Sequence, residues 1–371
     1  MMITIREVST RKDLKQFIRL PWSIYKGDPY WVPPLLMEEK ELYDPARHPF
    51  FGHGEVRLYL AERAGEVVGR IAGIINHAHN EFHKDRVGFF GCFEAVEEPG
   101  VARALFDTVK DFLRSRQMNT MRGPMNYSTN EVCALLVDGF DSSPCIMMPY
   151  NPRYYIDLLE GYGFRKAKDL VAYHLARENF DPRVRKLAER IRERTSFVVR
   201  HIDIKKINEE IERIKQVYNY AWEKNWGFVP MRDEEFSYLA KKIKQIADAR
   251  FCVVVEHRGR PVAFMLNLPD YNMLFKKMNG RFFPFGIFIF LLGRKKIPHV
   301  RTLTLGVVKE FRGAGIEVLL YTTLLDFSYK TGITEAEMSW ILEDNTLMRK
   351  GLEDLNCKVY KTYRIYDYPL A

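Results

Sequence analysis

The chain has 371 residues, 47% of them hydrophobic and 28% charged, which is typical of a soluble globular protein long enough for two domains. Its net charge of +9 allows an anionic partner such as a nucleotide-bearing cofactor, a membrane surface or a nucleic acid. The lysines and arginines are spread along the chain without an RNA-binding or helix-turn-helix signature, so we expect no nucleic-acid partner.

The cysteines point to a reducing compartment. They are odd in number and form no CxxC pair, which argues against a zinc ribbon and a disulfide scaffold: Cys92, Cys133, Cys145, Cys252 and Cys357. The N-terminal residues lack the apolar core of a signal peptide, and no apolar run reaches the ~18 residues of a spanning helix. We therefore expect a cytoplasmic protein without a bound metal, whose contact with a membrane is at most peripheral, at the inner membrane face.

The first half of the chain alternates strand and helix patterns. A strand, a helix and a loop rich in Trp, Tyr and Pro come first, at Ile3–Glu7, Lys12–Leu20 and Pro21–Pro34. Three strands, two helices and a strand are predicted next, at Val56–Glu62, Val67–Ile75, Val87–Phe93, Val101–Leu113, Asn151–Leu159 and Leu170–Leu175.

The second half repeats this order. Its patterns lie at Phe251–Glu256, Val262–Leu268, Arg301–Val308, Ile316–Phe327, Ala336–Leu342, Asn345–Leu355 and Val359–Tyr366. The hairpins are offset by 251 − 56 = 195 positions and the late helices by 345 − 151 = 194, which a duplicated α/β domain explains. Each half adds an insertion that the other lacks, at Tyr127–Tyr150 and at Tyr271–His299. We predict domains at 1–178 and 197–371, joined by a charged linker helix at 179–196.

A glycine-containing turn separates a β-branched strand from a helix within Leu305–Leu320. The first turn of a helix offers free backbone N–H groups and the positive end of the helix dipole, and glycines let a pyrophosphate approach the backbone. Arg312 adds a positive charge. The turn is either a phosphate cradle or a plain strand–helix connection.

This turn resembles the CoA-binding motif of the Gcn5-related N-acetyltransferase (GNAT) superfamily, Gln/Arg-x-x-Gly-x-Gly/Ala after a strand, which Arg312 and Gly315 match. The resemblance implies an α/β (α+β) fold of two tandem GNAT-like domains, each a mixed, largely antiparallel sheet flanked by helices. It also implies that the strand takes the pantetheine and the turn the pyrophosphate of a co-substrate, acyl-CoA or acetyl-CoA. The implied cofactor-binding residues are Leu305, Val307, Val308, Arg312, Gly313, Ala314, Gly315 and Ile316.

Acidic residues follow the strand that would face this site. By the same resemblance, Met338–Leu342 would bring Glu343, Asp344 and Asn345 to its mouth. An amine must lose a proton before it attacks a thioester, so Glu343 or Asp344 could act as the base, in a catalytic cluster with Asn345. The same residues also fit a helix N-cap with acidic neighbours.

Two positions depart from the family pattern. Glu317 stands where Gly or Ala is usual, and Leu352 stands where a tyrosine commonly protonates the leaving thiolate. These departures favour, as one alternative, a non-catalytic GNAT-derived binding protein. Another alternative is an acetyl-CoA-dependent N-acetyltransferase of a small molecule or a protein.

A closer resemblance covers nearly the whole chain. The segments LGVVKEFRGAGIEVLLY, FFGCFE, NPRYYIDLLEGYGF and MSWILEDNTLMRKGLEDLNCKVYKTYRIYDYPL resemble a bacterial family of paired GNAT-like domains, some of whose members are regarded as ceramide-synthase-like. This implies an acyl-CoA-dependent N-acyltransferase whose partners are a CoA ester and an amine acceptor, with a long-chain, sphingoid-type amine as the candidate acceptor. In the first half the equivalent turn carries Glu94, Glu97 and Glu98, which would repel a pyrophosphate, so we expect CoA binding in the second domain alone.

An apolar run with basic flanks occupies the second half's insertion. Phe282–Leu292 is interrupted by Pro284 and Gly286, and as a helix it would reach about 16 Å, too short for a hydrocarbon core of about 30 Å. It is either a buried core segment or an interfacial anchor or acyl-chain groove whose basic flanks meet anionic headgroups. Because the first half lacks a counterpart, we include a membrane surface among the expected partners.

Overall fold

The computed structural model describes residues 2–222, 225–246 and 249–370, so the outermost residues of the two predicted domains, 1 and 371, lie outside the described residues. The chain forms two compact units. The first comprises Met1–Leu170, Phe275–Ile289 and Lys361–Ala371, and the second comprises Val171–Leu274 and Phe290–Tyr360. The boundaries inferred from the duplication stay a prediction about the sequence repeat.

The first unit is built on a mixed sheet flanked by helices. Its strands lie in the order β1 (Ile3–Glu7), β2 (Gly54–Arg63), β3 (Glu66–Asn76), β4 (Val87–Ala95), β5 (Thr120–Gly123) and β13 (Lys358–Pro369), and β6 (Leu135–Asp138) also pairs with β13. Strands β1 to β4 are antiparallel, and β4 and β5 are parallel.

Helix α5 (Pro99–Ser115) packs on β1 to β4, as its spacing of apolar residues predicted. The other helices of this unit are α1 (Arg11–Arg19), α2 (Pro21–Ile24), α3 (Leu36–Leu42), α4 (His77–His83) and α6 (Tyr155–Tyr162). Helix α1 starts with a capping box, in which Thr10 accepts from the Asp13 N–H and the Asp13 carboxylate accepts from the Thr10 N–H.

The second unit repeats this architecture. Its strands lie in the order β8 (Phe197–His201), β9 (Cys252–His257), β10 (Arg260–Pro269), β11 (His299–Val307), β12 (Glu335–Leu342) and β7 (Arg165–Ala176). Strands β8 to β11 are antiparallel, and β11 and β12 are parallel.

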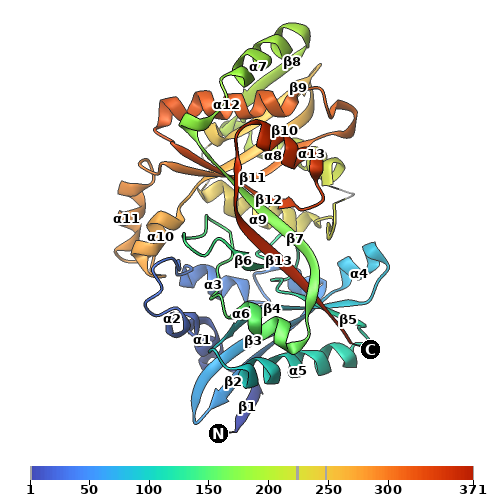
Figure 1. Ribbon diagram of the computed structural model, residues 1–371, viewed down its shortest axis with the longest axis vertical. Helices are drawn as coiled ribbons and strands as arrows, with labels where there is room; N and C mark the ends of the chain where they lie inside the picture. Colours follow the sequence, from blue (N-terminus) through green and yellow to red (C-terminus); the bar gives the residue numbers. More distant parts are fainter. Residues whose placement is uncertain (1, 223–224, 247–248, 371) are drawn as a thin grey trace. The chain divides into compact units, whose positions relative to one another are not determined.

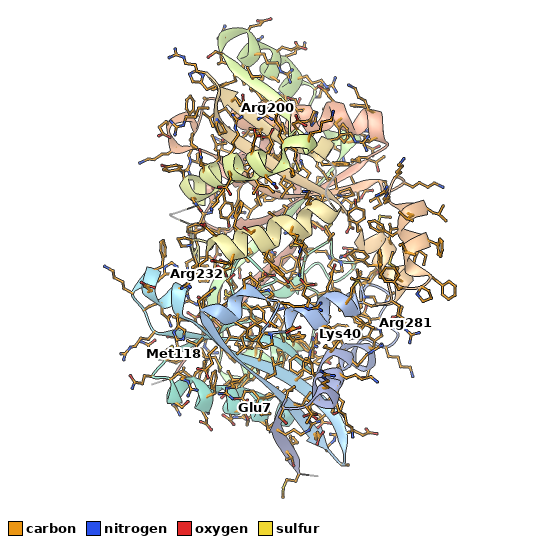
Figure 2. The ribbon with its side chains drawn as sticks, turned by 180° about the vertical axis from the view of Figure 1, so that it is seen from behind. Glu7, Lys40, Met118, Arg200, Arg232 and Arg281 are labelled. Atoms are coloured by element: carbon orange, nitrogen blue, oxygen red, sulfur yellow. The ribbon has the colours of Figure 1, made fainter. Side chains whose placement is uncertain are left out.

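Helices cover the sheet of this unit, as Figure 1 shows. Helix α12 (Ile316–Thr331) packs on β9 and β10, α7 (Arg183–Arg194) packs against α12, and α8 (Ile207–Trp222) packs on β10 and β11. The remaining helices are α9 (Asp233–Ile246), α10 (Asn272–Met278), α11 (Gly286–Gly293) and α13 (Thr346–Asp354). In the view from behind, α8 and α9 lie in front of the strands (Figure 2). No helix among the described residues is both long and apolar enough to cross a bilayer.

Each half of the chain gives its last strand to the other half's unit. Strand β7 ends in the second unit, beside β12, and β13 ends in the first unit, beside β5. There Tyr366 of β13 lies opposite Gly123 of β5 in an antiparallel ladder. The sheet that begins with the N-terminal strand is therefore completed by the C-terminal strand.

The strands and helices predicted from periodicity are present, with small shifts at their ends. The helix expected at Asn151–Leu159 begins later, as α6, because Tyr154 is its N-cap. The loop expected at Pro21–Pro34 contains the short helix α2, with Pro21 in its first turn. The predicted insertions hold β6 in the first half and α10 with α11 in the second. The mixed sheets and flanking helices confirm the predicted fold class.

Candidate functional site

Two parallel strands of the second unit stop pairing partway along their length. Residues His299–Thr302 of β11 pair with Glu335–Met338 of β12, and no further pairing between these strands is found in the described part of the chain. At the same point β11 carries a β-bulge: Thr302 and Thr304 pair with successive residues of β10, so Leu303 is the extra residue. The edge of β11 beyond Thr302 therefore lacks the ladder partner that β12 provides before it.

Two buried polar atoms lie on these strands just past the last pair. The hydroxyl of Thr304 on β11 and the indole N–H of Trp340 on β12 have no hydrogen-bond partner among the described residues. Leaving such a group unpaired costs roughly 1–3 kcal/mol. Both groups therefore suit a ligand that carries its own polar atoms.

The turn after β11 leaves several backbone N–H groups free. Gly313 and Gly315 both have φ of 80°, a conformation that favours glycine, and Gly315 is the N-cap of α12 without a side-chain cap. Within the described residues, no hydrogen bond reaches the N–H groups of Gly313, Gly315, Ile316 and Glu317. Free N–H groups at a helix start can accept an anion, so the phosphate-cradle interpretation of this turn stays a prediction.

Arg312 stands exposed beside these N–H groups. Its Nε donates to the Val307 carbonyl at 3.3 Å and its Nη2 to the Ala221 carbonyl at 2.9 Å. No acidic side chain pairs with it in the part of the chain that the structure describes. Its charge is therefore available to an anion at the turn.

The other predicted cofactor residues are mostly core residues. Val307, Val308 and Ile316 are buried, and Leu305 is half-buried against the same core. Such positions can meet a ligand through backbone atoms, which suits a strand that lacks a ladder partner. Ala314 is exposed in the turn, where its N–H donates to the Phe311 carbonyl at 3.2 Å.

The predicted catalytic residues lie at the start of α13. The Asn345 side chain accepts from the Met348 N–H at 3.3 Å, so it is the N-cap that the sequence offered as the alternative role. The Glu343 carbonyl accepts from Arg349 at 2.9 Å, and Asp344 is exposed. A catalytic role for Glu343, Asp344 or Asn345 stays a prediction.

A buried polar network beside the parting strands was missed by the sequence reasoning. Arg301 donates to the Ser339 hydroxyl at 2.9 Å, and the hydroxyls of Ser339 and Tyr360 both donate to the Glu337 carboxylate. Arg301 and Glu337 are 1% and 0% exposed. The available signal was the alternation of the polar residues Glu335, Glu337 and Ser339 along β12.

The family's tyrosine position, Leu352, is fully buried in the core of the second unit. It offers no proton to a ligand. A tyrosine hydroxyl is present instead at Tyr360, which donates a hydrogen bond to the Glu337 carboxylate.

The first unit closes the corresponding place with its own chain. Strand β4 carries a bulge at Cys92, whose φ is 52°. Beyond the paired residues of β4 and β5, the Met125 N–H donates to the Phe90 carbonyl at 2.8 Å, and the Cys92 N–H donates to the Asn126 side chain at 2.9 Å. The edge of β4 is thus occupied by protein.

A carboxylate in this unit is also held in the interior. Glu94 accepts from the hydroxyls of Tyr155 at 2.7 Å and Tyr25 at 3.0 Å, and lies 3.7 Å from Arg70. Burial raises the pKa of Glu94 above its ordinary value. Glu94 is therefore a structural carboxylate, whereas Glu98 pairs with Arg63 beside the start of α5.

Two mixed sheets in one chain, each with four antiparallel strands, a parallel pair and a bulge at the fourth strand, define a tandem GNAT fold. A tandem GNAT protein from the clavulanic acid biosynthesis pathway superposes with a TM-score of 0.59 at 12% identity, over 100% of this chain and 99% of that one. A GCN5-related N-acetyltransferase from Sphaerobacter thermophilus gives a TM-score of 0.50 at 11% identity, over 99% and 96%. No family model matches the chain.

Two relatives align over nearly their full lengths. Protein YghO of Escherichia coli is 35% identical over 372 residues, covering 98% of this chain and 94% of that protein. The bacterial ceramide synthase of Caulobacter vibrioides is 35% identical over 379 residues, covering 99% and 98%. The chain belongs to this paired-domain, ceramide-synthase-like family of GNAT-fold acyltransferases.

Proposed function

We propose that the protein is an acyl-CoA-dependent N-acyltransferase whose second unit binds the CoA ester. The observation that carries the proposal is the set of free N–H groups at Gly313, Gly315, Ile316 and Glu317 beside Arg312, directly after a strand without a ladder partner. A pyrophosphate would accept from these N–H groups and pair with the Arg312 guanidinium.

The pantetheine arm would continue from the turn along the free edge of β11. An arm with two amide groups can pair with strand backbone as a neighbouring strand would. The Thr304 hydroxyl and the Trp340 indole N–H would then gain the partners that they lack.

In the proposed reaction, the amine nitrogen attacks the thioester carbonyl, a C–N bond forms and the C–S bond breaks. Strand N–H groups stabilise the oxyanion, and CoA leaves as the thiolate. A carboxylate takes the amine proton. Glu343 and Asp344 are the candidates from sequence, and the structure adds Glu337, whose carboxylate accepts from the Tyr360 hydroxyl.

For the acceptor we propose a long-chain, sphingoid-type amine. The support is full-length similarity to a protein named bacterial ceramide synthase. An amine of this class resides in a bilayer, so its acylation needs a protein surface that meets lipid.

The test is calorimetric titration of the full chain with CoA esters of increasing acyl length. We expect binding that tightens with a long acyl chain. Arg312→Gln should weaken it by about tenfold to 100-fold, since a charge-assisted contact to phosphate contributes roughly 1.5–3 kcal/mol. Arg185→Gln is the matched control, because Arg185 pairs with Asp326 further along α12.

Other outcomes decide against the proposal. A preference for acetyl-CoA would favour an N-acetyltransferase of a small molecule or protein. Absence of binding to every CoA ester would contradict both the N-acyltransferase and the N-acetyltransferase hypotheses and would favour a GNAT-derived binding protein.

A further inference from the structure

Helices α10 and α11 form a helical hairpin. We call residues 272–298, which contain both helices and the segment after α11, the α10–α11 hairpin. Two glycines of α11 permit close packing on α10: a Cβ at Gly293 would lie 2.5 Å from Leu274, and one at Gly286 would lie 3.3 Å from Met278. Tyr271 also stacks near Phe290, with ring centroids 5.1 Å apart. The inner side of α11 is thus fixed by packing.

The α10 end and the connecting loop of the hairpin are hydrogen-bonded to the N-terminal segment and to Ser143. The Trp22 indole donates to the Asn279 side chain at 2.8 Å, and the Leu36 N–H donates to the Gly280 carbonyl at 3.0 Å. Lys276 donates to the Ser143 hydroxyl at 3.1 Å. These contacts hold the loop that leads into α11 in one place.

The outer side of the hairpin is apolar and exposed. Its large side chains have exposed fractions of 63% for Phe283, 76% for Phe285, 60% for Phe288, 51% for Leu291 and 75% for Leu292. Positions 285, 288 and 292 share one face of a helix. This exposure rules out the buried-core interpretation of the segment, and an exposed apolar cluster of this kind marks an interaction surface.

Charge identifies the partner. Between Asn272 and Pro298 the chain has no Asp or Glu, while its basic residues are Lys276, Lys277, Arg281, Arg294, Lys295 and Lys296. Figure 2 labels Arg281 at the start of the loop, and Arg294, Lys295 and Lys296 are exposed directly after α11. A second copy of this hairpin would bring like charges together, whereas an anionic bilayer pairs with both the apolar face and its basic rim.

We infer that the α10–α11 hairpin docks on the surface of an anionic phospholipid bilayer. Helix α11 lies in the interfacial plane with Phe285, Phe288 and Leu292 among the acyl chains. The basic rim meets the headgroup phosphates. The inference concerns this surface alone and holds whether or not the protein transfers an acyl group.

Flotation of the full chain with vesicles tests the inference. We expect it to float with vesicles of phosphatidylglycerol and phosphatidylcholine, and to bind pure phosphatidylcholine vesicles less. Phe285→Glu/Phe288→Glu should weaken binding by about tenfold or more, because it puts two charges into the apolar contact. The matched control is Phe82→Glu, since Phe82 is 41% exposed on α4, the helix in the corresponding connection of the first half.

A second variant tests the charges separately. Arg294→Gln/Lys295→Gln/Lys296→Gln should remove the preference for phosphatidylglycerol, and about 0.5 M salt should do the same to the wild type. Unchanged thermal unfolding of both variants would show that they remain folded.

Three results would overturn the inference. They are failure of the wild type to float, flotation of Phe285→Glu/Phe288→Glu equal to that of the wild type, and a concentration-dependent dimer that this variant abolishes. The last would make the surface a contact between two copies of the chain.

Discussion

Arg301 of β11 and Glu337 of β12 are register partners, and their side chains form an ion pair of 3.5 Å at the end of the paired part of these strands. The Ser339 hydroxyl joins them, since it accepts from Arg301 and donates to Glu337. The two strands are thus bound together by charge at the place where their backbone ladder ends.

Removing one member of this pair should destabilise the protein more than removing both. Glu337→Leu leaves a buried guanidinium without its carboxylate, which costs about 3–5 kcal/mol, whereas Arg301→Met/Glu337→Leu leaves no unpaired charge. Urea unfolding of Arg301→Met, Glu337→Leu and the double variant measures these losses of stability. Additive losses would show that the two charges do not interact.

The carboxylate that accepts the proton can be identified by replacing each candidate with its amide and comparing kcat. We expect Glu337→Gln to lower kcat by about 100-fold or more. Glu343→Gln and Asp344→Asn should lower kcat by less than about tenfold. Asn345→Ala is the structural control, with a loss of about 1 kcal/mol in stability from the helix cap. The reverse order of kcat losses would assign the base to the start of α13.

Thr304→Val should separate stability from binding. The substitution keeps the shape of the side chain and removes a buried hydroxyl without a partner, so the free enzyme should be as stable as the wild type or more so. The CoA ester should bind several-fold more weakly. Thermal unfolding with and without a CoA ester measures both effects. A large loss of stability without ligand would mean that the hydroxyl already has a partner in the protein.

The protein should bind one CoA ester per chain, since the first unit fills the edge of β4 with Met125 and Asn126. Asn126→Ala leaves the Cys92 N–H unpaired and should cost about 1–3 kcal/mol in stability. Its CoA-ester affinity should stay unchanged. Isothermal titration gives the stoichiometry, and a value of two would refute closure of the first unit.

Stability should depend on pH through His299. Burial lowers the pKa of His299, but the Asp270 carboxylate, 3.6 Å away, outweighs burial and leaves the pKa above its ordinary value of 6.5. The folded state then binds the proton more tightly than the unfolded state, so this stabilisation is present below pH 6.5 and is lost as the pH rises through the folded pKa. The difference in unfolding free energy between the wild type and His299→Gln should shrink toward alkaline pH. A constant difference would contradict the ion pair.

Local sequence patterns predicted most of the fold, because period and turn residues are local properties. Hairpins such as β2–β3 and helices such as α5 and α12 follow directly from them. The exchange of β7 and β13 could not be predicted, since each strand has the same local pattern whichever sheet receives it. Strand choice depends on long-range pairing.

The candidate site divides in the same way. The glycine turn at Gly313 and Gly315 before α12 was predictable because glycines and a helix start are visible in the sequence. The burial of Glu337 was not predictable, because acidic residues at alternate strand positions usually indicate the solvent-facing side of a strand. The exposure of Phe285 was equally hidden, since composition alone favours burial of such a run.

Because β13 completes the first sheet, this sheet cannot be finished until the C-terminal strand has been translated. Residues of β5 leave the ribosome long before β13 exists, and until then Thr120–Gly123 is an open strand edge that another chain can pair with. A stop codon shortly before Lys361 would therefore damage the half of the protein that was translated first. If the two halves were expressed separately, each would lack a strand that the other half carries.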